Sequence, residues 1–250
     1  MKRYLFILIL LISNQVYAAT VPDLKVGTNK SPAHQPEDQK YTKARHYLVN
    51  NELKPLGIKD PSVIAAMKKV QRHEFVPEKY RDRSYENISL PIGKLQTISQ
   101  PYMVALMTAA IRPSAGDKVL EIGTGTGYAA AVLGEIVDQV YTIEIESELA
   151  NTADARLKRL GYTNVHVKIG DGFFGWPEEA PFDGIILTCN ADKVPPKLGE
   201  QLKEGGRLVM PLGADYTPQT LVVVTKANGK LVSRPLVEVQ FVPMVGEIKK

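Results

Sequence analysis

Residues Lys118–Tyr128 read KVLEIGTGTGY, and this stretch decides the fold. It begins with an apolar run of strand length and continues through three glycines at alternate positions into a helical stretch. Glycine has no Cβ, so Gly123, Gly125 and Gly127 can adopt backbone angles closed to other residues and can let a ligand lie against bare main chain. The stretch therefore predicts a ligand-binding turn between a strand and a helix.

An acidic residue follows the next predicted strand at the distance that a nucleoside site requires. Glu144 comes 21 residues after Gly123 and ends the apolar run Val140–Ile143, where its carboxylate can accept hydrogen bonds from a ribose diol. A dinucleotide fingerprint would place a glycine at position 128, whereas this chain has Tyr128. The pattern favours a nucleoside cofactor without a pyrophosphate, of which S-adenosylmethionine is the obvious member.

From Asp117 onward, short apolar runs alternate with helical stretches that begin near Thr126, Ser147 and Pro195. This alternation predicts a parallel sheet with helices on both faces. An Asn228-Gly229 turn between two further apolar runs predicts an antiparallel hairpin at the sheet edge. The fold class is α/β: a Rossmann-like, doubly wound, mostly parallel sheet with a C-terminal antiparallel hairpin and small N-terminal helices. The predicted strands are Lys118–Ile122, Gln139–Ile143, Val165–Ile169, Gly184–Leu187 and Arg207–Pro211, with Leu221–Thr225 and Leu231–Val239 in the hairpin.

The beginning of the chain has the pattern of an export signal. Lys2 and Arg3 precede the apolar run Tyr4–Ile12, and Ala18 offers a small residue for cleavage, so residues 1–18 are expected to be a signal peptide. The apolar run is far shorter than the ~20 residues that span a membrane, so no membrane attachment is expected after its removal. A periplasmic or secreted location follows as an expectation.

The rest of the chain divides by composition. Residues 19–39 are polar and contain several prolines, which is typical of a flexible lead. Residues 40–250 are expected to form a single domain, with N-terminal helices and a long loop in 40–116 and a cofactor-binding core in 117–250. The polar stretch Arg72–Gln100 is too long for a passive connection, and such loops usually serve a site.

Charge and composition exclude several classes of function. The 250-residue chain has a formal net charge of +4, and removal of Lys2 and Arg3 leaves +2 without a long basic run, so nucleic acid is not an expected partner. Cys189 is the only cysteine, so no internal disulfide can form. The four histidines lack the spacing of metal ligands, and no metal site is expected.

A third candidate for the ligand site follows the strand Val165–Ile169. Open parallel sheets bind ligands beyond the carboxyl ends of their strands, so Asp171 is expected on the same edge as Gly123 and Glu144. There its carboxylate could receive the exocyclic amine of an adenine. Taken alone, Asp171 is equally typical of a turn residue that bonds its own backbone.

Five segments give the chain a specific resemblance. They are LPIGKLQTISQPY (Leu90–Tyr102), VLEIGTGTGY, NVHVKIGDGFFGWPEEAPFDGIILT, QLKEGGRLVMPLG and FVPMV. In order and spacing, from about Val63 to Val245, they resemble the protein-L-isoaspartate O-methyltransferases. That family has a class I Rossmann-like fold, uses S-adenosylmethionine, and methylates the free carboxylate of L-isoaspartyl residues, and of D-aspartyl residues, in damaged proteins. The resemblance implies an enzyme that starts protein repair through a succinimide.

The resemblance also assigns roles to single residues. The serine of the QTIS segment is Ser99, which the family places at the acceptor carboxylate. The implied cofactor-binding residues are Gly123, Thr124, Gly125, Glu144, Asp171 and Gly172. The implied substrate-binding residues are Thr97, Thr188 and Asn190.

Several alternatives stay open at this stage. Ser99 precedes Gln100-Pro101, an ordinary helix start, so it could serve only as a helix cap. Many relatives have small residues after the fourth strand, where this chain has the larger, polar Asn190, which could face the substrate peptide, so the acceptor selectivity stays open. Another carboxylate acceptor, or a noncatalytic nucleoside-binding module, is the rival to the repair enzyme. The family is usually cytoplasmic, which is the alternative to export, and a monomer is expected.

Overall fold

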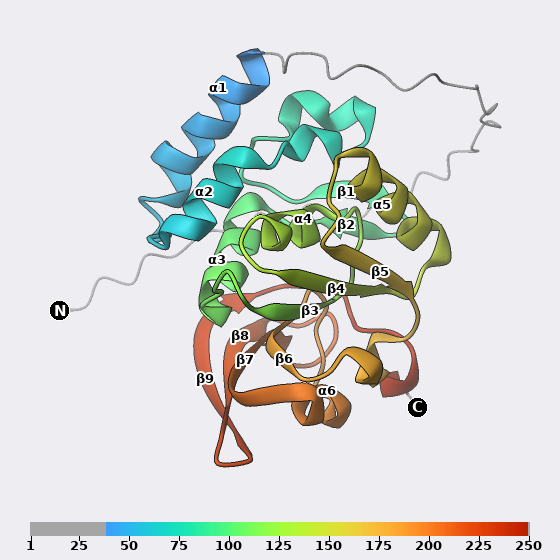
Figure 1. The fold of residues 1–250 in the computed structure, drawn as a ribbon. Helices are drawn as coiled ribbons and strands as arrows, with labels where there is room; N and C mark the ends of the chain where they lie inside the picture. Colours follow the sequence, from blue (N-terminus) through green and yellow to red (C-terminus); the bar gives the residue numbers. More distant parts are fainter. Residues whose placement is uncertain (1–38, 250) are drawn as a thin grey trace. The chain divides into compact units, whose positions relative to one another are not determined.

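A seven-stranded sheet organises the chain, with strand order β5-β4-β3-β6-β7-β8-β9 (Figure 1). Strands β3 to β7 pair in parallel, and β8 and β9 continue the sheet as an antiparallel hairpin. The predicted fold class is confirmed. The strands are β3 Lys118–Ile122, β4 Gln139–Glu144, β5 Val165–Ile169, β6 Phe182–Leu187, β7 Leu202–Leu212, β8 Gln219–Ala227 and β9 Lys230–Val239.

The computed structural model describes residues 39–249, which belong to one compact unit. The predicted signal peptide and most of the predicted lead lie outside the described residues, and Gln39 already begins the first helix. No helix among the described residues combines the length and apolar character needed to cross a membrane. The helices are α1 Gln39–Tyr47, α2 Pro61–Lys69, α3 Pro101–Ile111, α4 Tyr128–Gly134, α5 Ser147–Arg159 and α6 Pro196–Gln201.

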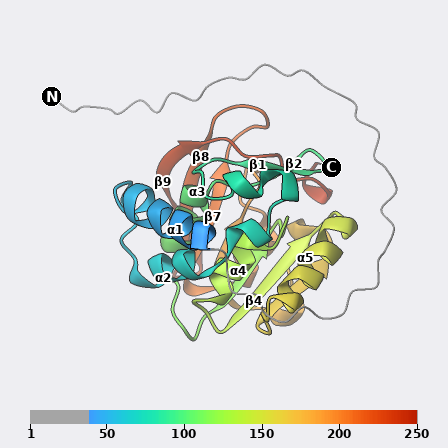
Figure 2. The ribbon, with the colours of Figure 1, turned by 90° about the horizontal axis from the view of Figure 1, so that it is seen from above.

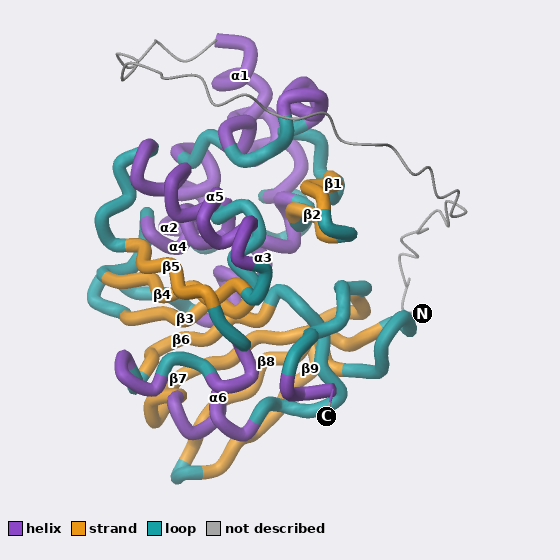
Figure 3. Tube along the Cα trace, turned by 90° about the vertical axis from the view of Figure 1, so that its right-hand side faces the viewer, coloured by secondary structure: helices purple, strands orange, loops and turns teal. Residues whose placement is uncertain are grey.

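Each face of the sheet carries its own apolar core, because neighbouring residues of a strand point to opposite faces. In β3, Val119 contributes to the core that also contains α3, α4 and α5, whereas Leu120 and Ile122 contribute to the core under α6. Figure 3 shows helices on both sides of the strands. Burial on both faces explains why these strands read as continuous apolar runs in the sequence.

The N-terminal helices extend the core on the α4 side. The Asp60 side chain accepts hydrogen bonds from the main-chain N–H groups of Ser62 and Val63 and caps α2, and Pro61 fixes the first helical turn. Helix α2 then buries Val63 and Met67 against α3 and α4, while α4 and α5 lie over β4 (Figure 2). The capping therefore sets the start of the helix that backs the glycine turn.

The long loop contains a hairpin that the sequence did not predict. Strands β1 (Leu90–Gly93) and β2 (Gln96–Ile98) pair across a turn in which Lys94 and Leu95 have φ angles of 51° and 57°. Both strands are short and β1 contains a proline, so the sequence shows no strand-like alternation here. Because the Cδ1 atom of Ile92 lies 3.6 Å from where a Cβ on Gly125 would stand, the hairpin covers the glycine turn.

Candidate active site

The glycine turn follows β3 at the point where the strand order reverses, between β4 and β6. Gly123, Gly125 and Gly127 have φ angles of 97°, 53° and 85°, in the left-handed region that side chains disfavour. A Cβ on Gly123 would stand 2.3 Å from the Thr188 hydroxyl oxygen. Glycine is therefore required at position 123 for space as well as for conformation.

The structure brings Glu144 to this turn, as predicted. The Glu144 residue is 7% exposed, and its carboxylate accepts hydrogen bonds from the main-chain N–H of Gly125 at 2.8 Å and of Glu146 at 3.1 Å. These two bonds fix the carboxylate beside the glycine turn. An ionised carboxylate has about four acceptor positions, so Glu144 keeps capacity for both hydroxyls of a ribose.

Beneath the turn lies a buried polar chain that the sequence reasoning missed. The hydroxyls of Thr124 and Thr142 are 2.7 Å apart, and the Thr142 hydroxyl donates to Glu121 at 2.6 Å. Burial raises the pKa of Glu121 to about 8; the Thr142 hydrogen bond opposes this rise and the nearby charge of Glu144 adds to it. The Thr124 side chain thus supports the turn from below, while its main-chain N–H and C=O bond to Ile143 and Gly127 within the protein. The only sequence signal was an acidic residue inside an apolar strand.

Asp171 lies at the same sheet edge, after β5, and its carboxylate is already held by two main-chain donors. One oxygen accepts from the Phe173 N–H at 2.9 Å, which is the local turn bond that the sequence allowed. The other accepts from the Glu247 N–H at 2.7 Å, from the far end of the chain. Gly172 packs against the end of β3, because a Cβ there would stand 2.3 Å from Ile122 Cγ2. The segment after β5 therefore touches the strand that bears the glycine turn.

Ser99 does not cap the helix that follows it. The N-cap residue of α3 is Gln100, which makes no side-chain capping bond, and the Asn87 side chain accepts the Tyr102 N–H at 2.9 Å instead. Ser99 lines a cavity of about 10 Å³, room for about one water molecule, together with Thr188. The remaining lining residues are Val104, Met107, Thr108, Ala129 and Ile186.

The three residues implied in substrate binding have different environments. Thr97 is exposed on β2, one residue before the buried Ile98. The Thr188 hydroxyl lies within hydrogen-bonding distance of the Gly123 and Ile122 carbonyl oxygens, at 2.8 and 3.0 Å, so it braces the glycine turn as well as lining the cavity. Asn190 is fully buried and therefore offers no exposed surface to a substrate.

Asn190 supports a loop from within. Its side-chain N–H group donates to the Gly213 carbonyl at 3.1 Å and to the Asp215 carboxylate at 3.2 Å. Its main chain pairs with the C-terminal segment through Val242 and Met244. Asn190 therefore does not face a substrate peptide directly, and an effect on acceptor selectivity would have to pass through these neighbours.

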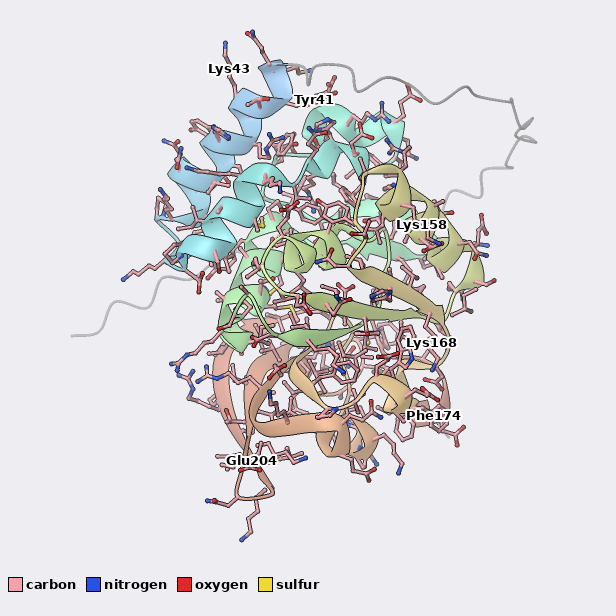
Figure 4. All side chains as sticks on the ribbon, viewed as in Figure 1. Tyr41, Lys43, Lys158, Lys168, Phe174 and Glu204 are labelled. Atoms are coloured by element: carbon pink, nitrogen blue, oxygen red, sulfur yellow. The ribbon has the colours of Figure 1, made fainter. Side chains whose placement is uncertain are left out.

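Two aromatic side chains near the site have opposite environments. The Tyr128 ring is buried between Phe75, at 5.6 Å between ring centroids, and the Arg72 guanidinium, at 4.8 Å from its centroid. Its bulk therefore lies in the core against Met67 of α2, away from the turn that precedes it. Phe174, which follows Asp171, is 48% exposed at the surface (Figure 4).

The arrangement fits a nucleoside cofactor. Bare main chain at Gly123 and Gly125 lies beside a carboxylate suited to a ribose, and a second carboxylate follows the next strand, as an adenine amine requires. Together with the strand order, this defines the chain as a class I, S-adenosylmethionine-dependent methyltransferase.

Comparisons with known proteins identify the family. Residues 43–249 match the model of the family "Protein-L-isoaspartate(D-aspartate) O-methyltransferase (PCMT)", and the chain belongs to this family. The protein-L-isoaspartate O-methyltransferase of Opitutus terrae is 52% identical over 224 residues, which cover 90% of this chain and 94% of that protein.

Two solved structures are similar in fold. One is a protein-L-isoaspartate O-methyltransferase with a TM-score of 0.73 and 33% identity, over 82% of this chain and 67% of that one. The other, from Plasmodium falciparum, is described as a beta-aspartate methyltransferase in complex with S-adenosyl-L-homocysteine. It has a TM-score of 0.69 and 26% identity, over 80% of this chain and 98% of that one.

Proposed function

We propose that this enzyme transfers a methyl group from S-adenosylmethionine to the free α-carboxylate of L-isoaspartyl residues in damaged proteins, and to the β-carboxylate of D-aspartyl residues. The observation that carries the proposal is the position of Ser99. Its capping role is taken by Asn87, and it lines a cavity with Thr188, whose hydroxyl braces Gly123. Ser99 thus borders the same small cavity as the residue that braces the glycine turn, which supports a role for its hydroxyl at the acceptor.

The residues at this position suit a carboxylate acceptor. Model carboxyl groups have pKa values near 4, so the acceptor is ionised at neutral pH and needs no general base. Bound S-adenosylmethionine supplies an electrophilic methyl group on a sulfonium. The task left to the protein is to hold a carboxylate oxygen about 3 to 3.5 Å from that methyl, and the hydroxyls of Ser99 and Thr97 are suitable donors.

Exclusion of water would favour the reaction, because the positive sulfonium and the negative carboxylate neutralise each other during transfer. The hairpin β1–β2 carries Ile92 over Gly125, and the Lys94 ammonium makes a 2.9 Å ion pair with Glu148 at the start of α5. An exposed ion pair of this kind contributes little energy. The apolar contact of Ile92 is therefore the stronger reason to regard the hairpin as a cover.

The methyl ester then allows repair without further help from the enzyme. The neighbouring backbone nitrogen attacks the ester carbonyl, methanol leaves, and a succinimide forms. Water opens this ring in either direction, which returns part of the chain to the normal aspartyl linkage. The enzyme starts the repair, and the damaged chain completes it.

Methylation of matched peptides tests the proposal. The protein is incubated with methyl-labelled cofactor and with three peptides of one sequence that contain L-isoaspartyl, L-aspartyl or D-aspartyl at one position. We expect base-labile label on the isoaspartyl peptide, weaker label on the D-aspartyl peptide and little on the aspartyl one. Equal labelling of the isoaspartyl and aspartyl peptides would favour a methyltransferase for other carboxylates. Cofactor binding without any labelling would favour a noncatalytic nucleoside-binding module.

We also propose that the protein is exported to the periplasm or secreted, with the cytoplasm as the alternative. Lys2 and Arg3, the apolar run Tyr4–Ile12 and the small residue Ala18 support export. Export would separate the enzyme from the cytosol, where its cofactor is made. Fractionation followed by N-terminal sequencing tests this: a terminus at Ala19 outside the cytoplasm is expected, and an intact Met1 in the cytosol would overturn it.

A monomer that needs no membrane is the proposed working form. Light scattering of the purified mature protein should give the mass of one chain, and a larger mass at working concentration would reject the monomer.

A further inference from the structure

The last residues of the described chain cross the edge of the sheet that holds the candidate cofactor site. We call residues 244–249 the C-terminal turn. Figure 1 shows it, in red, beside the segment that follows β5, and the Glu247 N–H donates to the Asp171 carboxylate there. Asp171 and Glu247 are 76 residues apart in sequence. A remote segment therefore supplies one of the two main-chain donors to a predicted cofactor ligand.

The C-terminal turn is anchored at both ends. The Met244 N–H donates to the Asn190 carbonyl at 2.9 Å, just after β6, and the Met244 side chain is buried in the core under α6. Ile248 packs against the same core on the other side of the turn. Strands β6 and β5 are three positions apart, about 14 Å, which the few residues from Val242 to Glu247 can span.

Gly246 is the residue that lets the turn approach Asp171. Its φ angle is 102°, and a Cβ would stand 2.3 Å from one Asp171 oxygen and 2.7 Å from the other. Any side chain at position 246 must push the carboxylate or the turn aside. The contact between the turn and Asp171 is thus specific to the glycine at this position.

We propose that the C-terminal turn positions Asp171 for the adenine of the cofactor, through the main-chain N–H of Glu247. Without this donor, the carboxylate keeps only the Phe173 N–H and can rotate, so part of the binding energy is lost to ordering it. The inference rests on the proposed function, because it takes Asp171 as the adenine partner. It goes further by assigning a role in cofactor affinity to residues that carry no binding motif.

Calorimetric binding of S-adenosylhomocysteine tests the inference with two matched pairs of variants. Gly246→Ala is paired with Gly57→Ala, because Gly57 has nearly the same φ angle, 101°, and open space around a Cβ. Glu247→Pro removes the N–H donor, and Glu247→Ala retains it while removing the side chain. We expect roughly tenfold weaker binding in Gly246→Ala and Glu247→Pro and near wild-type binding in the two controls, all measured well below each melting temperature.

A double-mutant cycle decides whether the turn acts through Asp171. In an Asp171→Ala background, Gly246→Ala should cause no further loss, because no carboxylate is left to position. Additive losses would overturn the inference, and so would unchanged affinity in both Gly246→Ala and Glu247→Pro. If the wild-type protein itself does not bind S-adenosylhomocysteine, the proposed function fails, which separates that failure from failure of this inference.

Discussion

The two halves of the candidate site are held together in different ways. One half, which we call the cradle, is the glycine turn with the strand ends around it, residues 118–146. The hydrogen bonds within it join Gly125 to Glu144 over 19 residues and Thr124 to Thr142 over 18, and the Thr188 hydroxyl adds a bond from outside to Gly123, 65 residues away. The other half, the cover, consists of residues 87–102 and the C-terminal turn. The bond from the C-terminal turn to Asp171 spans 76 residues.

This difference indicates that the cradle and the cover have different roles in the reaction. The cradle is buried and is held by hydrogen bonds from main chain and side chains, so its geometry is fixed once β3 has paired with both β4 and β6, and it suits a ligand that must be held in one orientation. The cover consists of short or irregular segments that meet the rest of the site through contacts such as that of Ile92 with Gly125 in the cradle and that of the Glu247 N–H with Asp171 after β5. We expect changes in the cradle to alter stability or cofactor affinity. Changes at the acceptor side of the cover should alter turnover.

The largest expected effect is on stability and comes from the buried carboxylate of the cradle. The pKa of Glu121 is raised to about 8, so the folded protein keeps its proton between pH 4.5 and 8 while the unfolded chain loses it. The free energy of unfolding contributed by this bound proton is complete below the unfolded pKa of 4.5. It decreases as the pH rises toward the folded pKa and is lost above pH 8. Glu121→Gln cannot titrate, and relative to it the wild type should lose on the order of 4 kcal/mol between pH 4 and pH 8.5.

Urea unfolding of both proteins across this pH range provides the measurement. The amide introduces a pH-independent offset, so only the change in the difference between the two proteins is informative. A difference that stays constant with pH would mean that Glu121 titrates normally and that the cradle is more open to water than its burial indicates.

The second expected effect is on turnover and concerns the cover. Ser99→Ala should lower kcat with an isoaspartyl peptide about 100-fold, because the acceptor loses a donor that positions it, while S-adenosylhomocysteine affinity stays near wild type. Ser89→Ala, an exposed serine of the same loop, is the control. Normal turnover in Ser99→Ala would contradict the distinction between cradle and cover. A loss of cofactor affinity as large as the loss of turnover would contradict it as well.

Third, Glu144→Ala should weaken cofactor binding by about 2 kcal/mol, or roughly 30-fold, in the range for hydrogen bonds to a charged group. The variant also leaves the Gly125 N–H without its hydrogen-bond acceptor, so the glycine turn loses a bond that fixes its position. Glu146→Ala, two residues along and exposed, should bind normally. Calorimetry gives both affinities, and an unchanged value for Glu144→Ala would place the ribose elsewhere.

The smallest expected effect lies outside both halves. Asp60→Ala removes the cap of α2 and should cost about 1 kcal/mol of unfolding free energy, whereas Asp60→Ser should recover most of it. Turnover below the melting transition should be unchanged in both, since α2 only backs the core behind α4. A large loss of turnover would show that the N-terminal helices shape the site directly.

The cradle could be predicted from sequence because its signals are local. Apolar runs gave the strands, the alternate glycines gave the turn, and the spacing to Glu144 gave its partner. The same reasoning placed Asp171 at the right edge of the sheet. Tyr128 shows the limit of local reasoning: its position in the motif was correct, but the side chain turned into the core against Phe75.

The sequence by itself determined the order of strands and helices, the glycine turn and the carboxylates beside it, because hydrophobic periodicity and backbone chemistry act between near neighbours. Only the tertiary structure decided that Asn87 caps α3 in place of Ser99, that Asn190 is buried, and that Glu247 reaches Asp171. Each of these depends on segments that meet only after the sheet has formed. No pattern within a short window of sequence predicts these tertiary contacts, since the partner of each group depends on how distant segments pack in the whole fold.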